Sequence, residues 1–259
     1  MTPPRLEVRD LSVRFGGFVA LADIDLTVAR GERLDLIGPN GSGKTTVFNL
    51  VNGIYEPDTG SITFEGRNLV GLPPHRINRL GIARTFQNSR LFRNLSVLDN
   101  VRIAHHAHLE YGPLSALCRT GRFYSGEKHV QEKVENFLSI FLLQSRKNEM
   151  AGNLSYGDQR RLEIARALAS QPRLLLLDEP AAGMNPYEVG RLMEFILEIR
   201  ERFRLTILLI EHQMRLVMGI CERLAVMDFG QVIAQGLPAE IRENRRVIEA
   251  YLGEDVPFE

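Results

Sequence analysis

The chain has 259 residues, and its 32 Lys and Arg balance 32 Asp and Glu. A net charge of zero argues against a large, uniformly basic face of the kind that general nucleic-acid binders carry, and leaves a local basic patch open. The length is sufficient for one large domain, or for a core with a subdomain, to bury a hydrophobic interior.

The cysteines and the apolar runs indicate a soluble chain in a reducing compartment. Cys118 and Cys221 lie far apart in the sequence and form no metal or redox motif. Residues 1–5 lack the apolar core of a signal peptide. Apolar runs such as residues 174–177 and 207–210 have the length of strands and are far short of a membrane span.

The first third of the chain predicts antiparallel strands beside a nucleotide-binding core. Its apolar and polar side chains alternate, which is the pattern of half-buried strands. Turn signals occur at residues 29–32 and 56–60. The expected strands are residues 6–15, 21–28, 61–64 and 82–86.

The middle of the chain predicts an inserted helical subdomain. Residues 98–108 fit a helix, residues 111–126 resemble a loop, and from Glu127 onward apolar side chains recur on one helical face. These side chains are Val130, Val134, Phe137, Leu138, Phe141 and Leu142. The run from His105 to His108 is expected to be a solvated face, because adjacent helical side chains point apart and no Cys or carboxylate joins them at ligand spacing.

From Leu154 onward, strands and helices alternate as in a mostly parallel sheet with crossover helices. The expected elements are strands at 174–177, 206–210, 224–227 and 231–235, and helices at 187–203 and 214–221. A closing helix is expected to start at Pro238 and to pack back on the core through Ile241, Ile248, Tyr251 and Leu252.

The strongest motif is a glycine-rich run between an apolar strand and a helical segment, the context of a phosphate-binding P-loop. Its residues are Gly38, Pro39, Asn40, Gly41, Ser42, Gly43, Lys44, Thr45 and Thr46. Backbone N–H groups of such a loop converge on phosphate oxygens at a helix N-terminus. Lys44 would reach the β- and γ-phosphates and the Thr45 hydroxyl would ligate Mg²⁺, so the motif predicts binding of a nucleoside triphosphate.

Two carboxylates, Asp178 and Glu179, follow four leucines that suit a strand buried on both faces. Open α/β sheets bind ligands at the carboxyl ends of their strands. Asp178 would hold Mg²⁺ through water, and Glu179 would orient or deprotonate the water that attacks the γ-phosphate. The alternative is a pair of exposed carboxylates that cap the next helix.

Residues 154–159, Leu-Ser-Tyr-Gly-Asp-Gln, taken alone predict only a well-capped helix, with Ser155 and Asp158 in a capping-box spacing. Their place between the P-loop and the Asp178–Glu179 strand gives them a second interpretation. There they resemble the LSGGQ signature of the ATP-binding cassette (ABC) family. The P-loop, Gln87, this signature, Glu179 and His212 occur in the family's order over nearly the whole chain.

The resemblance implies an α/β fold, in which a RecA-like P-loop NTPase core carries an antiparallel β subdomain and an inserted α-helical subdomain. The core and β subdomain would comprise about residues 1–87 and 171–237, the helical subdomain about 88–170, and a C-terminal helix about 238–259.

It also implies roles for individual residues. Phe15 would stack on adenine, unless it is an ordinary strand residue, and Gln87 would touch Mg²⁺ and the attacking water and sense a transmembrane partner. His212 resembles the switch histidine that contacts the γ-phosphate. Ser155 and Gly157 would bind the γ-phosphate of ATP held by a second subunit, which implies a head-to-tail dimer with two ATP molecules.

Three positions depart from the family pattern. Tyr156 replaces the first glycine of the signature, and Asn185 stands where the family commonly has Asp. Asp35 is a carboxylate in a strand that should be buried, so it needs a hydrogen-bonding partner or a proton.

A narrower resemblance links the chain to the longer cassette of branched-chain amino-acid importers. It rests on residues 84–87, 90–93, 154–157, 179–186 and 250–254. In such importers, two different cassettes lie on the cytoplasmic face of the plasma membrane. They pair with two different membrane subunits and a periplasmic binding protein. Related cassettes serve the uptake of urea or short amides, or the export of lipopolysaccharide, so the cargo stays open. Whether the chain forms a homodimer or a heterodimer also stays open.

Residues 87–95 would line a groove for a helix of the membrane subunit, with Leu91 and Phe92 as apolar contacts or, alternatively, as subdomain core. A cassette acting on nucleic acid is disfavoured by the neutral charge and the absence of a long coiled-coil insertion. A regulator that does not hydrolyse ATP is disfavoured by Gln87, Glu179 and His212.

Overall fold

The structure is a computed structural model that describes residues 4–87, 90–105, 117–118 and 120–252. These residues form two compact units. The first unit comprises the described residues up to Arg84 and from Arg173 onward, and the second comprises those from Thr85 to Pro172. No helix among the described residues is both long enough and apolar enough to span a membrane.

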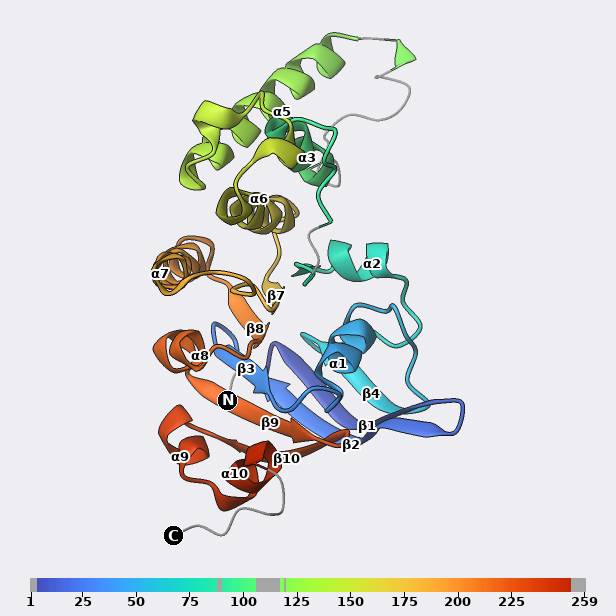
Figure 1. Ribbon diagram of the computed structural model, residues 1–259. Helices are drawn as coiled ribbons and strands as arrows, with labels where there is room; N and C mark the ends of the chain where they lie inside the picture. The colour runs from blue at the N-terminus through green and yellow to red at the C-terminus, as the bar shows by residue number, and fades with distance from the viewer. Residues whose placement is uncertain (1–3, 88–89, 106–116, 119, 253–259) are drawn as a thin grey trace. The chain divides into compact units, whose positions relative to one another are not determined.

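The first unit contains a six-stranded sheet in the order β10-β9-β3-β8-β7-β6 (Figure 1). All neighbouring strands are parallel except β9 and β10, which form an antiparallel hairpin. The strands are β3 (Arg33–Ile37), β6 (Ile82–Arg84), β7 (Leu174–Asp178), β8 (Thr206–Ile210), β9 (Arg223–Asp228) and β10 (Gln231–Gly236). Parallel strands place their carboxyl ends at one edge, so the segments after β3, β7 and β8 meet there.

A second, antiparallel sheet in the same unit has the order β2-β1-β4-β5. Its strands are β1 (Leu6–Phe15), β2 (Phe18–Val28), β4 (Thr59–Phe64) and β5 (Arg67–Asn68). The helices of this unit are α1 (Lys44–Val51), α2 (Pro74–Arg79), α7 (Pro186–Phe203), α8 (Met214–Ile220), α9 (Pro238–Arg242) and α10 (Arg245–Leu252).

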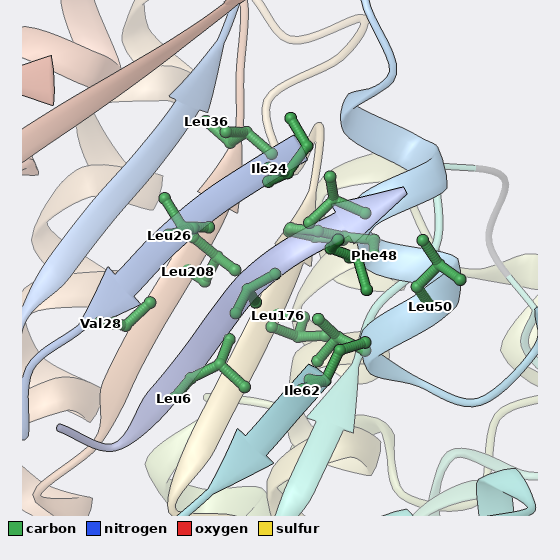
Figure 2. Packing of buried hydrophobic residues seen from close by; sticks show 14 of the residues in the cluster. Leu6, Ile24, Leu26, Val28, Leu36, Phe48, Leu50, Ile62, Leu176 and Leu208 are labelled. Carbon is green, nitrogen blue, oxygen red and sulfur yellow. The ribbon is translucent and has the colours of Figure 1, made fainter. Parts of the chain in front are cut away.

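The main core lies between the two sheets and α1. Every residue of β7 and β8 is buried, as expected for strands covered on both faces. Figure 2 shows Leu26 and Val28 of β2, Phe48 of α1, and Leu176 and Leu208 of the parallel strands, which belong to one cluster of buried side chains. Burying aliphatic side chains of this size contributes about 1.5–3 kcal/mol each. This packing holds the P-loop that precedes α1 against the sheet edge.

The described residues of the second unit are helical, with α3 (Val97–His105), α5 (Gly121–Ile140) and α6 (Tyr156–Ala169) and the short 3₁₀ turns Gln144–Arg146 and Ala151–Asn153. Helix α3 packs on both α5 and α6. Val130, Val134, Leu138 and Phe141, four of the apolar residues expected on one face, are buried. Leu142 of that set is exposed, because it lies beyond the end of α5 with φ +56°.

Three expectations need correction. Helix α5 begins at Gly121, inside a segment expected to be a loop, because an exposed glycine costs a helix only about 1 kcal/mol. The closing helix is two helices, since the Asn244 side chain accepts the Arg246 N–H and starts α10 anew. His105 is buried with Nδ1 3.4 Å from the Ala169 carbonyl oxygen, rather than part of a solvated face. The two other histidines of that run lie outside the described residues.

The packing of the C-terminal helices also differs in detail. Ile241 is buried as expected and Ile248 is half-buried, but Tyr251 is exposed by 44%. Val247 is the buried residue of α10. The side chain of Leu252 lies outside the described part of the chain.

Candidate nucleotide-binding and hydrolysis site

The P-loop connects β3 to α1 and requires glycine at two close approaches. Gly38 has φ +148°, and a Cβ atom there would lie 2.0 Å from the Met227 carbonyl oxygen. Gly43 has φ +103° and immediately precedes α1, and a Cβ atom there would lie 2.6 Å from Leu21 Cδ2. Only glycine fits both positions. The loop backbone therefore lies close against the sheet and leads directly into the N-terminus of α1. A helix N-terminus of this kind can bind phosphate groups.

Lys44 is buried within this loop. Its ammonium donates to the carbonyl oxygens of Gly38 and Pro39, both at 2.8 Å, and to Ser42 Oγ at 3.3 Å. Burial lowers the pKa of Lys44 below its usual range, and Glu179 and Asp35 partly offset this effect. The loop thus holds one positive charge at its centre. Thr45, the next residue, is exposed at the start of α1.

Asp178 ends β7 and is almost completely buried. Its Oδ2 lies 2.7 Å from Nη2 of Arg84, and Nη1 of the same guanidinium donates to Asn49 Oδ1 at 2.7 Å. Arg84 therefore links β6, β7 and α1 around the carboxylate. No sequence pattern indicated this role of Arg84, because only the fold places β6 beside β7.

Glu179, the next residue, adopts φ +45°, a conformation in which a non-glycine residue is uncommon. Its N–H donates to the Ile210 carbonyl oxygen at 2.8 Å, which joins it to the end of β8. Its Oε1 lies 3.3 Å from Nε2 of His212. Both side chains are partly exposed. The 3.3 Å distance shows that the structure brings together the two residues that the sequence assigned to hydrolysis.

Phe15 ends β1 and does not behave as an ordinary core residue. It is 45% exposed and makes an edge-to-face contact with Tyr55, with ring centroids 5.1 Å apart. An exposed aromatic pair of this kind is suited to stacking on a planar ligand.

Gln87, Ser155 and Gly157 belong to the second unit. Ser155 is the N-cap of α6, and its Oγ accepts the Asp158 N–H as expected. The buried Arg160 of α6 donates to the carbonyl oxygens of Phe86 and Gln87 at 2.9 and 2.6 Å. Arg160 also pairs with Glu163 at 3.0 Å, and Glu163 accepts the Phe86 N–H. Gln87 is therefore fixed to the helix that carries the signature residues.

Leu91 and Phe92 were expected either to contact a membrane subunit or to belong to the subdomain core, and the core interpretation fits only one of the two. Leu91 is buried, whereas Phe92 is 49% exposed. Arg166 lies over the Phe92 ring at 5.7 Å.

The oxygen atoms of Thr45 and Asp178 are suitable ligands for a hard divalent cation that is also bound by the phosphates of a nucleotide. Among the described residues, no group of three or more His, Cys, Asp or Glu side chains is placed to hold a metal ion. The candidates are instead the Thr45 hydroxyl and the Asp178 carboxylate, and magnesium is commonly held by one or two protein oxygens together with substrate phosphates.

Comparison with known proteins agrees with this geometry. The pattern of the ABC transporter family matches residues 21–182, and that of the branched-chain amino acid ATP-binding cassette transporter family matches residues 231–257. The high-affinity branched-chain amino acid transport ATP-binding protein LivG of Salmonella typhimurium is 48% identical over 98% of this chain and 100% of its own length. The lipopolysaccharide export system ATP-binding protein LptB of Acidithiobacillus ferridurans is 37% identical over 96% and 97%.

A solved structure shares the fold. The crystal structure of the ADP conformation of MJ1267, an ATP-binding cassette of an ABC transporter, is 32% identical, with a TM-score of 0.84 and coverage of 97% of this chain and 100% of that one. The fold expected from the sequence is thereby confirmed. The chain belongs to the ABC transporter family.

Proposed function

We propose that this chain is the ATP-hydrolysing subunit of a membrane importer for branched-chain amino acids. The observation that carries the hydrolytic part is the pairing of Glu179 with His212 at 3.3 Å, in the same unit as the P-loop and its buried Lys44. The cargo rests on similarity: the LivG protein is 48% identical, against 37% for the lipopolysaccharide export protein.

The P-loop residues would bind the triphosphate. The backbone N–H groups of residues 38–46 would surround the β- and γ-phosphates, Lys44 would neutralise part of their charge, and Phe15 would stack on the adenine. Thr45, Asp178 and Gln87 would hold Mg²⁺, which when bound neutralises charge on the phosphate oxygens. Arg84 keeps the Asp178 carboxylate oriented through its 2.7 Å ion pair.

Glu179 would act on the attacking water. Its carboxylate accepts a proton from the water as the oxygen attacks the γ-phosphorus, and the bond from that phosphorus to the β–γ bridging oxygen breaks. Base catalysis of this kind contributes about 10²–10⁴ in rate. His212 would contact the γ-phosphate, and its 3.3 Å contact with Glu179 would keep that carboxylate in place from the opposite loop.

The assembly would be a dimer of cassettes at the cytoplasmic face of the membrane. Ser155 and Gly157 lie at the N-terminus of α6, where the helix dipole favours the γ-phosphate of ATP held by a second cassette, either another copy or a sister subunit. Two membrane subunits would contact the region around Gln87 and the exposed Phe92. A substrate-binding protein outside the cell would deliver the amino acid to the membrane subunits.

Uptake of labelled leucine tests this proposal. Cells of the source organism that lack the native chain would carry either the wild-type chain or Glu179→Gln, with Glu201→Gln, an exposed residue of α7, as a matched control. We expect leucine uptake to collapse only with Glu179→Gln, while an unrelated solute still enters. Unchanged leucine uptake would contradict the cargo, and urea, short amides and lipopolysaccharide export would then be measured.

A further inference from the structure

Glu211 is a buried carboxylate that joins two loops of the site. It follows β8 directly and only 2% of it is exposed. Its Oε1 accepts the N–H of Ala181 at 2.7 Å. Its Oε2 accepts the N–H of His212 at 2.9 Å and that of Gln213 at 3.2 Å. Both oxygens are therefore occupied by backbone donors from two different segments.

The two segments carry the residues of the proposed chemistry. Ala181 lies two positions after Glu179, and the other two amides belong to the turn that presents His212. A second bond joins the same segments, since Gln213 Nε2 donates to the Ala181 carbonyl oxygen at 2.9 Å. The 3.3 Å separation of Glu179 and His212 is thus set between two loops that Glu211 holds together.

Asp35 is a second buried carboxyl that lies near Glu211. Asp35 is fully buried in β3, opposite Leu209 of the neighbouring strand, and neither of its oxygens accepts a hydrogen bond of normal geometry within the described structure. The backbone N–H groups of Glu211 and Leu36 lie near Asp35 and partly oppose the rise of its pKa that burial causes. A buried carboxyl beside a second carboxyl has its pKa raised. Glu211 accepts three amide N–H groups, whereas neither oxygen of Asp35 has a donor of normal geometry, so the proton belongs on Asp35.

We infer that Glu211 is a positioning residue, which sets the separation of Glu179 and His212 by holding the amides of Ala181, His212 and Gln213 on its two carboxylate oxygens. This inference rests on the proposed hydrolytic role of Glu179. Charge-assisted hydrogen bonds are about twice as strong as neutral ones. A displacement of about 1 Å at a reacting group can lower the rate about 10²-fold.

The requirement for two acceptor oxygens distinguishes this role from simple space filling. Glutamine has the shape of glutamate, but its NH₂ group would face at least one of the amide donors. Aspartate keeps both oxygens on a side chain shorter by one methylene. Positioning therefore predicts that Glu211→Asp retains more activity than Glu211→Gln, whereas a space-filling role predicts the opposite order.

The test is steady-state ATP hydrolysis by the full-length chain with its partner subunits. With Glu211→Gln we expect kcat to fall about 10- to 100-fold with KM for ATP within about twofold of wild type. With Glu211→Asp we expect kcat within about threefold to fivefold of wild type. Glu201→Gln, on the exposed face of α7, serves as the matched control and should behave as wild type. Equal kcat for Glu211→Gln and wild type, or a higher kcat for Glu211→Gln than for Glu211→Asp, would overturn the inference.

A second variant keeps the test decisive if Glu211→Gln fails to fold. Gln213→Met removes only the bond to the Ala181 carbonyl oxygen, and it should lower kcat about threefold with unchanged KM. Unchanged kcat in this variant would count against the loop coupling. Wild type and Glu179→Gln, assayed together, address the proposed function separately. If these two hydrolyse ATP equally, the hydrolytic site itself is wrong, whatever the Glu211 variants do.

Discussion

At the scale of single residues, the buried charges are the features that most constrain this protein. Asp35 is completely buried, and burial and the charge of the neighbouring Glu211 raise its pKa well above the ordinary value of 3.8. The backbone N–H groups of Glu211 and Leu36 and the charge of Lys44 act in the opposite direction. In the unfolded chain the same carboxyl ionises near pH 4. Between that pH and the folded pKa of Asp35, the folded chain therefore binds one more proton than the unfolded chain.

This difference makes stability fall as the pH rises. The contribution of Asp35 to the free energy of unfolding is fully present below the pKa that this carboxyl has in the unfolded chain. It is lost at about 1.4 kcal/mol per pH unit as the pH rises toward the pKa in the folded chain. The uncharged Asp35→Asn lacks this slope, so we expect it to be more stable than wild type at pH 8 and to differ least at pH 5. Urea unfolding at both pH values, at constant ionic strength, measures the difference. A free-energy gap that is the same at both pH values would show that Asp35 is not protonated in the folded chain.

The buried pair of Arg160 and Glu163 in the second unit gives a further prediction. Their side chains are 4% and 2% exposed, and together they bind three backbone groups of Phe86 and Gln87. Arg160→Met leaves Glu163 buried without its cation, so we expect a loss of about 3–5 kcal/mol in the free energy of unfolding. Adding Glu163→Leu should restore part of that loss, since no unpaired charge then remains. A double variant that is less stable than Arg160→Met would contradict this account.

At the scale of secondary-structure elements, the sequence predicted strands better than helix boundaries. The alternation of residues 6–15 matches β1, and the leucine run of β7 and the apolar run of β8 were recognisable because both strands are buried on both faces. The start of α5 was missed because glycine was taken as a loop signal. The break between α9 and α10 was missed because no proline or glycine marks it, and the Asn244 side chain that causes it is an ordinary polar residue until its partner is known.

The site shows the same division. The P-loop, Asp178 and Glu179 are recognisable from residue type and spacing, because phosphate binding needs glycines and a helix N-terminus in sequence order. His212 was indicated only by the resemblance to the ABC family. Arg160 and Glu211 act on backbone groups, and Arg84 acts on the side chains of Asp178 and Asn49. Partners remote in sequence are involved in each case, so no local pattern reveals these three residues. Glu211 stands beside His212 in the sequence, but only the fold brings the Ala181 amide to it.

Helix α7 offers a prediction about the departure at Asn185. The Asn185 side chain accepts the N–H groups of Tyr187 and Glu188, and Glu188 accepts the Asn185 N–H in return, which forms a capping box. We expect Asn185→Ala to lower the free energy of unfolding by about 0.5–2 kcal/mol. Asn185→Asp keeps the acceptor oxygen and adds a charge favoured at a helix N-terminus, so its stability should equal or exceed that of wild type. Thermal unfolding of both variants measures this, and a loss in Asn185→Asp as large as in Asn185→Ala would contradict it.

At the scale of the whole molecule, the proposed catalytic residues are divided between two units. The P-loop, Glu179 and His212 belong to one, and Gln87, Ser155 and Gly157 belong to the other. Under the proposed function, a second cassette would supply its signature residues to the ATP bound by this chain. We therefore predict that hydrolysis depends on assembly and that a single chain is catalytically incomplete.

The most direct test of the central claim is phosphate release and ATP-dependent association of Glu179→Gln with its partner cassette. Because the substitution removes the base but keeps the P-loop, we expect phosphate release to fall at least about 10²-fold. We also expect ATP to produce a stable dimer that is visible by size-exclusion chromatography. Phosphate release by Glu179→Gln at the wild-type rate would contradict the account. So would a Glu179→Gln chain that stays monomeric at every ATP concentration, both alone and with a sister cassette.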